Sequence, residues 1–305
     1  MMHSPGCHIC GGALRSHFGA VLDPQTRETF AIEECVACGV GQTLVRDADL
    51  SRYYGDAYHG GRHGLTAAYC ARRRLQLVAR VAGAGRRLLD VGCGDGTFLL
   101  AARKQGWRVA GTEFNAGIAR AAGLDVGETP AQVQEFGPFD CITLWHSLEH
   151  MRDPRALLKT LAQSLAPGGV LLVAVPDAGG LQSRAFGPKW FHLDVPRHLY
   201  HFGRRSLARL LELSGFRVTH RWYQEFEYDV MGWSQSALNA FMPAPNLFFN
   251  ALTGRRGGEH GRGWKAAGYV LGVCSLGLAI PLTAVGALLR RGGTLVFAAR
   301  REECD

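Results

Sequence analysis

Residues 86–113 decide the fold of this chain and read RRLLDVGCGDGTFLLAARKQGWRVAGTE. An apolar run ends in the glycine-rich turn 92–96, and a helix-like stretch follows over 97–105. A second apolar run, 107–111, leads to an acid, Glu113. Strand, glycine turn, helix, strand and acid in this order are typical of units that bind a nucleoside-bearing cofactor at the mouth of a parallel sheet.

The glycine turn distinguishes between two kinds of cofactor. A dinucleotide-binding turn reads G-x-G-x-x-G, and its third glycine admits the pyrophosphate at the start of the helix. In this chain Thr97 occupies the position of the third glycine, and the turn reads G-x-G-x-G instead. The negative charge of Asp95 would also lie beside the pyrophosphate and oppose its binding. The same carboxylate suits a ligand with a cationic sulfonium and an amino-acid tail. Glu113 is expected to accept hydrogen bonds from both ribose hydroxyls.

With Asp90 at the end of the first strand, this segment resembles the first motif of class I S-adenosylmethionine-dependent methyltransferases. The resemblance implies a doubly wound α/β fold with a seven-stranded, mostly parallel sheet, and S-adenosyl-L-methionine as the cofactor. The residues expected at the cofactor are Asp90, Gly92, Gly94, Asp95, Gly96, Glu113, Phe114 and Trp145.

Alternating strands and helices continue along the chain, as this fold requires. Apolar runs predict strands at 139–145, 170–175 and 216–222, and Pro154 begins a helix that ends near 165. A last strand is expected at 294–299. The resemblance implies that it returns as an antiparallel edge of the sheet.

Two histidine-rich loops follow strands of this sheet. Residues 145–154, WHSLEHMRDP, and 189–202, KWFHLDVPRHLYHF, resemble stretches of small-molecule methyltransferases, including those of ubiquinone biosynthesis. The catalytic candidates are His146, His198 and His201, because a histidine of ordinary pKa can remove a hydroxyl proton near neutral pH. A structural hydrogen bond is the open alternative for each. Some ubiquinone-type relatives hold a metal with an acid where this chain has His146, which argues against a catalytic metal here.

Two C-x-x-C-G motifs lie near the amino terminus, with Cys7 and Cys10 in the first and Cys35 and Cys38 in the second. Four thiolates with no open position are typical of a structural zinc ion. A redox dithiol and a nucleic-acid-binding ribbon are alternatives, and the sparse basic residues between the motifs weaken the latter. The motifs also resemble the leader of bacterial methyltransferases of sugar and cell-surface glycan pathways.

Composition indicates a globular protein, with 47% hydrophobic and 20% charged residues and a net charge of +8. The basic residues form short dispersed clusters rather than a stripe, so no nucleic-acid partner is expected. Paired cysteines and the absence of a visible signal peptide predict a cytoplasmic location. The oligomeric state is not predicted by any pattern in the sequence.

An apolar insertion precedes the last strand, and its residues 266–289 carry no charge. This length can span a bilayer, but a single crossing would leave the last strand on the wrong side of the membrane. A helical hairpin formed with the apolar stretch 231–252 could instead dip into one leaflet from the cytoplasmic side, with arginines such as Arg255 and Arg290 as anchors. A buried helical pair is the alternative.

The sequence therefore predicts a zinc-ribbon-like leader at 1–46, a linker and helix at 47–85, a methyltransferase domain at 86–228 and 293–305, and an apolar helical insertion at 229–292. The leading function is O-methylation of a small-molecule or lipid-linked acceptor by a histidine base. Alternatives are carbon methylation of a deoxysugar nucleotide, an NAD(P)-dependent oxidoreductase, and a non-catalytic zinc-ribbon and membrane adaptor.

Overall fold

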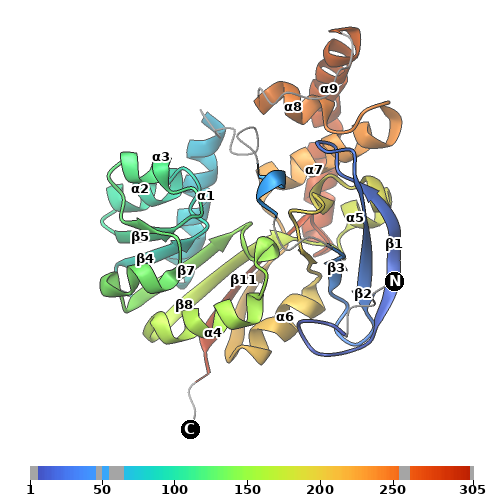
Figure 1. Cartoon of the computed structure of the whole chain (residues 1–305). Helices are drawn as coiled ribbons and strands as arrows, with labels where there is room; N and C mark the ends of the chain where they lie inside the picture. The colour runs from blue at the N-terminus through green and yellow to red at the C-terminus, as the bar shows by residue number, and fades with distance from the viewer. Residues whose placement is uncertain (1–5, 46–49, 55–64, 254–261, 303–305) are drawn as a thin grey trace. The chain divides into compact units, whose positions relative to one another are not determined.

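A computed structural model describes residues 6–45, 50–54, 65–253 and 262–302 (Figure 1). Parts of the predicted linker, and Arg255 of the insertion, lie outside these ranges. The chain divides into two compact units. The sheet unit comprises residues 62–175, 208–222 and 296–305, and the ribbon unit comprises 1–61, 176–207 and 223–295.

A seven-stranded sheet with the order β10-β11-β8-β7-β4-β5-β6 forms the centre of the sheet unit. Its strands are β4 (Arg87–Val91), β5 (Arg108–Thr112), β6 (Val126–Gly127), β7 (Phe139–Trp145), β8 (Leu165–Pro176), β10 (Phe216–Trp222) and β11 (Thr294–Arg301). The pairs β4–β5, β4–β7, β5–β6 and β7–β8 are parallel, and β10–β11 is antiparallel. The predicted doubly wound α/β class is confirmed.

The position predicted for the last strand is wrong in one respect. We expected it at the edge of the sheet, but β11 lies between β8 and β10, and β10 is the edge strand. The burial of β11 explains this arrangement, because residues 295–299 are apolar and fully buried, as a strand with neighbours on both sides requires. β10 is instead buried only at Phe216, and its other positions are partly or fully exposed.

Helices cover this sheet because their apolar faces need a partner. They are α1 (Leu65–Val81), α2 (Thr97–Lys104), α3 (Gly117–Ala121), α4 (Pro154–Ser164) and α6 (Arg204–Leu213), with 3₁₀ turns η2 (Pro130–Phe136) and η3 (Leu148–His150). Side chains of α1 and α2, such as Val78 and Leu99, form one core with β4, β7 and β11. Figure 1 shows α4 on the other face of the sheet.

The helix predicted at 154–165 is α4, and its first turn is stabilised by the residue that precedes it. The Asp153 carboxylate accepts a hydrogen bond from the backbone N–H of Ala156 at 2.8 Å, and Pro154 occupies the first turn. At its other end, α4 passes directly into β8 at Leu165. β8 therefore begins earlier than the strand predicted at 170–175.

The ribbon unit contains a four-stranded sheet with the order β1-β2-β3-β9, in which neighbouring strands run antiparallel. Its strands are β1 (Leu14–Leu22), β2 (Thr29–Cys35), β3 (Gly41–Thr43) and β9 (Tyr200–His201), and its short helices are η1 (Ser51–Tyr53), α5 (Leu181–Phe186), η4 (Gly187–Lys189) and η5 (Phe191–Leu193). The histidine-rich stretch 189–202 therefore adds a strand to the amino-terminal ribbon.

One buried ion cluster holds the ribbon to this stretch. The side chain of Arg197 is 1% exposed, and its guanidinium donates to the carboxylates of Asp23 and Asp194, each at 2.8 Å. Although burial opposes its charge, these two carboxylates raise the pKa of Arg197 above its ordinary value. Removing one partner would leave an uncompensated charge inside the unit.

The predicted apolar insertion forms three helices of the ribbon unit, α7 (Phe226–Phe241), α8 (Leu247–Thr253) and α9 (Arg262–Leu288). α7 ends before Pro243, as proline requires. α9 packs against both α7 and α8 (Figure 1). It is the one helix in the described ranges that is long and apolar enough to cross a membrane, a test that core helices of soluble proteins also pass.

Candidate cofactor and metal sites

The glycine turn connects β4 to α2 at the carboxyl ends of the parallel strands, where ligands bind in such sheets. Gly92, Gly94 and Gly96 all have positive φ, at 77°, 57° and 80°. The backbone N–H groups of Gly92 and Cys93 donate to the carbonyl oxygen of Thr112 at 2.8 and 3.0 Å. The turn is therefore fixed to the end of β5, and only glycine fits its three left-handed positions without strain.

The three glycines differ in what a side chain would meet. A Cβ on Gly92 would lie 2.6 Å from the Cβ of Ser147, and one on Gly96 would collide with Leu124. A Cβ on Gly94 would meet nothing within 4 Å. Gly92 and Gly96 are therefore needed for packing, whereas Gly94 leaves open space in which a ligand can approach the backbone.

Two acids shape this open space. The Glu113 carboxylate follows β5 and accepts a hydrogen bond from the backbone N–H of Gly94 at 2.8 Å. The Asp95 carboxylate accepts from the backbone N–H of Thr97 at 2.9 Å and so closes an Asx turn just before α2. The structure thus brings the predicted acids Glu113 and Asp95 together at the turn.

Asp90 is buried beneath the turn. The hydroxyl of Thr143 donates to its carboxylate at 2.6 Å. Burial nevertheless raises the pKa of Asp90 to about 7, and the charge of Arg74 only partly offsets this effect. Asp90 therefore supports the turn from below rather than facing solvent.

Arg74 lies beside two of the predicted cofactor residues, Asp90 and Trp145, but the sequence did not single it out. Its guanidinium lies 4.9 Å from the centre of the Trp145 ring, a cation–π distance. Arg74 is buried on the same face of α1 as Leu75 and Val78. A charged residue on the apolar face of a helix was the signal that could have identified it.

The two aromatic residues expected at the cofactor are placed differently. Trp145 is buried in the core with Phe98, and their ring centres lie 5.8 Å apart. Phe114 is 82% exposed directly after Glu113. Phe114 therefore offers a ring face beside the turn, whereas the Trp145 indole is part of the packing below it.

His146 lies in the sheet unit with the cofactor residues. It directly follows β7 and has a left-handed conformation, with φ of 54°, which is uncommon for a residue with a side chain. Its Nδ1 lies 3.7 Å from the Glu149 carboxylate. The next residue, Ser147, donates to the carbonyl oxygen of Val91 at 2.6 Å, so this loop adjoins the glycine turn.

His198 and His201 belong to the ribbon unit. Thr43 donates its hydroxyl proton to the carbonyl oxygen of His198 at 2.7 Å, so it must accept from Nε2 of His201, 2.9 Å away. His201 thus uses Nε2–H in a buried hydrogen bond within the ribbon. Nδ1 of His198 lies 2.9 Å from the carbonyl oxygen of His192 and must donate to it, which makes Nε2 the basic nitrogen of His198.

The four predicted zinc ligands come together in the ribbon unit. All four Sγ atoms lie within 4.8 Å of one another, with Cys7–Cys38 at 3.7 Å and Cys10–Cys35 at 3.5 Å. A tetrahedral ion with Zn–S bonds of about 2.3 Å separates its sulfurs by roughly 3.8 Å. The cluster therefore fits a zinc ion without rearrangement. His8 points elsewhere, with Nδ1 3.1 Å from the hydroxyl of Tyr200.

The thiols of this cluster differ in acidity. Burial raises the pKa of Cys7 to about 11 and raises that of Cys38 further. Burial also opposes ionisation of Cys35, but hydrogen bonds from the backbone N–H groups of Cys38 and Ala37 outweigh it and lower the pKa to about 7.

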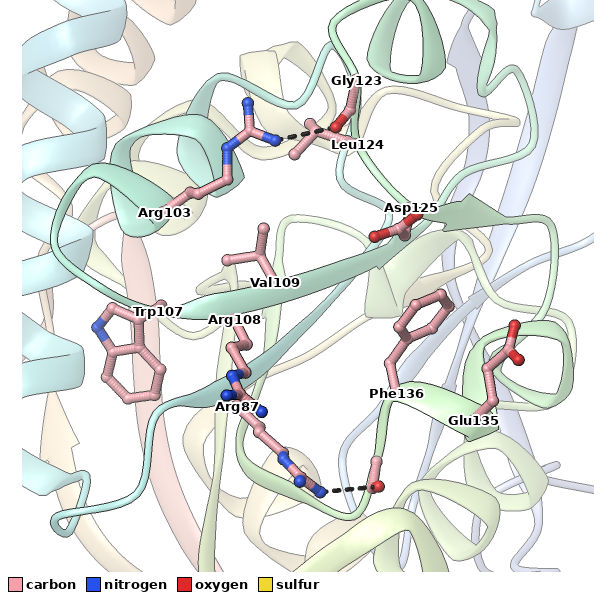
Figure 2. Close-up of a pocket in the computed structure, with 11 residues that line it drawn as sticks. Arg87, Arg103, Trp107, Arg108, Val109, Gly123, Leu124, Asp125, Glu135 and Phe136 are labelled. Atoms are coloured by element: carbon pink, nitrogen blue, oxygen red, sulfur yellow. Dashed lines mark hydrogen bonds between the residues drawn. The ribbon is translucent and has the colours of Figure 1, made fainter.

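A separate cavity of about 570 Å³ lies at the amino ends of strands β4 and β5 of the large sheet (Figure 2). Its wall includes Arg87 and Arg108, the first residues of β4 and β5. Two of its arginines are already held by backbone carbonyl oxygens, with Arg87 bonded to Gly137 at 3.0 Å and Arg103 to Gly123 at 2.9 Å. Since ligands of such sheets bind at the carboxyl ends of the strands, this cavity is distinct from the cofactor site.

Fold and turn together define a doubly wound α/β protein with a nucleoside-cofactor site. A family model described as "Methyltransferase domain" matches residues 62–221, more than half of the chain. The chain therefore belongs to this family of methyltransferases, as the sequence analysis expected.

The chain is also similar to parts of several curated relatives. The chain is similar to a ubiquinone biosynthesis O-methyltransferase of Xanthomonas campestris, at 34% identity over 146 residues, covering 42% of this chain and 60% of the relative. A namesake from Caulobacter sp. is 35% identical over 102 residues, covering 30% and 40%. The chain thus spans about half the length of such relatives.

Among solved structures, a SAM-dependent methyltransferase from Archaeoglobus fulgidus has a TM-score of 0.48 at 18% identity, covering 83% of this chain and all of that one. Coclaurine N-methyltransferase bound to N-methylheliamine and SAH has a TM-score of 0.46 at 16% identity, covering 76% and 70%.

Proposed function

We propose that the protein transfers a methyl group from S-adenosylmethionine to a hydroxyl oxygen of a small-molecule or lipid-linked acceptor. The observation that carries this proposal is the glycine turn, which leaves open space at Gly94 directly beside the Glu113 carboxylate. The name shared by the curated relatives, ubiquinone biosynthesis O-methyltransferase, supports oxygen as the acceptor atom.

Each residue at the turn has a part in holding the cofactor, which when bound supplies a methyl group activated by a positively charged sulfur. Glu113 would exchange its hydrogen bond from Gly94 for bonds from the ribose hydroxyls. The exposed ring of Phe114 offers a surface for the adenine. Asp95, at the start of α2, adds negative charge opposite an ammonium group of the amino-acid tail.

We assign the base to His146 or His198. The acceptor oxygen gains the methyl group as its proton passes to the imidazole, and S-adenosylhomocysteine is the product. His146 adjoins the glycine turn, and Nε2 of His198 is its basic nitrogen. His201 is the weaker candidate, because its Nε2–H already donates to Thr43. An imidazole base predicts a rate that rises with pH as the ring loses its proton.

This assignment is tested with labelled S-adenosylmethionine and a prenylated phenol as acceptor. We expect His146→Ala or His198→Ala to lower kcat by about 100-fold or more, and the exposed His220→Ala to leave it unchanged. Full turnover in both variants would contradict the base. Transfer of the label to a ring carbon of this acceptor, identified by NMR of the product, would show carbon methylation and overturn O-methylation.

We also propose that the cysteine cluster holds a structural zinc ion. Its spacing matches tetrahedral thiolate coordination, and a Cβ on Gly12 would lie 3.0 Å from Sγ of Cys35, so glycine is needed beside the sulfurs. The ribbon has a small core of its own, and a zinc ion would contribute about 10 kcal/mol or more to its folding.

Elemental analysis of the purified protein tests the zinc proposal. We expect one zinc ion per chain, lost in Cys10→Ser and kept in Cys274→Ser, an exposed cysteine outside the cluster. Removing the zinc with a chelator should also lower Tm. Zinc bound equally by both variants would contradict the assignment. Reduced thiols at this spacing suit the cytoplasm, where we propose that the protein works.

A further inference from the structure

α9 differs from the other helices of the ribbon unit in composition and in burial. From Gly263 to Leu288 it carries one charged residue, Lys265, and its most apolar window has a mean hydropathy of 2.0. Only 22% of that window is buried. A core helix of a soluble protein is mostly buried, so burial separates α9 from that class.

The side of α9 that contacts protein is a row of small residues. The buried or half-buried positions along this side are Gly268, Gly272, Ser275, Ala279, Thr283 and Gly286. A Cβ on Gly272 would collide with the Phe248 ring of α8, and one on Gly268 would lie 2.9 Å from Leu247. The hydroxyl of Ser234 in α7 donates to the carbonyl oxygen of Gly272 at 3.2 Å. Small residues thus let α7 and α8 approach the α9 backbone closely.

The remaining circumference of α9 consists of large apolar side chains in solvent. Its exposed large residues are Trp264, Tyr269, Val270, Leu271, Val273, Leu278, Ile280, Leu282, Val285 and Leu288. Leu278 is 71% exposed and Leu288 is 83% exposed. A surface helix in water carries polar residues there. Small residues toward protein and large apolar residues away from it are instead the arrangement of helices in lipid.

Basic residues lie at both ends of this apolar surface. Lys265 is exposed in the first turn of α9, and Arg290 is exposed just after its last turn. The carbonyl oxygen of Arg291 accepts from the backbone N–H of Leu181, so the exposed Arg184 of α5 lies near the same end. Basic groups beside an apolar helix complement anionic lipid headgroups.

The charges also distinguish a membrane from a second copy of this chain. Two α9 helices packed side by side, in either direction, would bring one basic end against another. An anionic bilayer would instead pair with both ends and receive the apolar side chains between them. The polar residues of α7, among them Gln235 and Asn239, are buried on the protein side, which favours a helix lying in one leaflet over a crossing.

We propose that the exposed surface of α9 docks the protein onto an anionic phospholipid bilayer and inserts into its outer apolar layer. This inference goes beyond methyl transfer and does not depend on it. It would place the enzyme at the surface where lipid-linked acceptors reside.

Vesicle flotation of the full chain, without S-adenosylmethionine, tests the proposal. We expect binding to phosphatidylcholine vesicles that contain phosphatidylglycerol. Leu271 and Leu278 lie two helical turns apart on the exposed surface, and the double variant Leu271→Asp/Leu278→Asp should weaken binding by about 100-fold or more. Ile118→Asp, at a residue of similar exposure (61%) in the sheet unit, is the matched control and should bind normally.

A second variant tests the headgroup preference. Arg290→Gln/Arg291→Gln should lower the preference for anionic over neutral vesicles by about fivefold per charge removed. Circular dichroism and S-adenosylhomocysteine affinity report whether the variants are folded. The proposal is overturned if the folded wild-type chain stays unbound, if the leucine variant binds as well as wild type, or if α9 mediates dimerisation that those aspartates abolish while vesicle binding persists.

Discussion

Replacement of Glu113 by alanine probes the cofactor site most selectively. Glu113 lies at the carboxyl end of β5, and its carboxylate accepts hydrogen bonds from the backbone N–H groups of Gly94 at 2.8 Å and, more weakly, of Asn115 at 3.4 Å. The side chain is half-buried rather than part of the core. The substitution therefore removes the acceptor for the ribose hydroxyls and leaves the sheet intact.

The size of the effect follows from the hydrogen bonds involved. A hydrogen bond to a charged group contributes about 1.5–3 kcal/mol, and alanine would leave the ribose without its carboxylate partner. We therefore expect Glu113→Ala to raise the Kd for S-adenosylhomocysteine by roughly 10- to 150-fold. The loss of the bond to Gly94 should lower the free energy of unfolding by only about 1 kcal/mol.

Isothermal titration calorimetry measures the affinity, and urea unfolding measures the stability. Asp125→Asn is the matched control, because this exposed acid lies just before β6, at the amino end of that strand and away from the glycine turn. It removes one negative charge and should leave the Kd unchanged. A Kd for Glu113→Ala within about twofold of wild type would refute the proposed ribose contact.

Three further predictions follow from the same contacts. Gly94→Ala should fold, because its Cβ meets no protein atom, and it should lose cofactor affinity, because that Cβ would occupy the space left for the ligand. Gly96→Ala should instead lose mainly stability, because its Cβ collides with Leu124. Equal stability of the two variants in urea would contradict this division. Burial raises the pKa of Asp90 to about 7, so between pH 5 and 7 this carboxyl is already ionised in the unfolded chain but still protonated in the folded one, and the folded state loses stability as the pH rises. Asp90→Asn lacks that loss, and its stability advantage over wild type should grow by about 2–3 kcal/mol between pH 5 and 8; a constant difference would show that Asp90 is ionised in the folded chain. Arg197→Met leaves Asp23 and Asp194 without their buried partner and should cost about 3–5 kcal/mol in unfolding experiments. The exposed Arg209→Met should cost less than about 1 kcal/mol, and similar losses in the two variants would contradict the role of burial.

Residues 86–113 predicted their own structure well because each local signal agreed with the fold. The apolar run of β4, the three glycines and the acid after β5 all lie where the pattern placed them. The four cysteines were also predictable, since the spacing C-x-x-C places two sulfurs on one turn. These features depend on residues close together in the sequence.

Features that depend on distant residues were missed. The order of the last two strands is decided by pairing between β11 and residues some eighty positions earlier, so the edge position could not be read locally. The pairing of β3 with β9 joins residues 41–42 to 200–201, and it engages His201 in a hydrogen bond with Thr43. No local pattern in the sequence indicates such a partner.

The apolar insertion at 229–292 combines a feature that the local sequence predicted with one that depends on distant residues. Its apolar composition was evident in the sequence, but the division of α9 into a small-residue side and a large apolar side became meaningful only with α7 and α8 in place. The exposure of Leu278 and its neighbours then distinguished α9 from a buried core helix.

The central claim is that the turn at 92–96 binds S-adenosylmethionine rather than a dinucleotide. Calorimetric titration of the full chain with S-adenosylhomocysteine and, separately, with NADH tests it most directly. We expect saturable binding of S-adenosylhomocysteine with one site per chain, and no heat of binding with NADH. Binding of NADH without binding of S-adenosylhomocysteine would contradict the account.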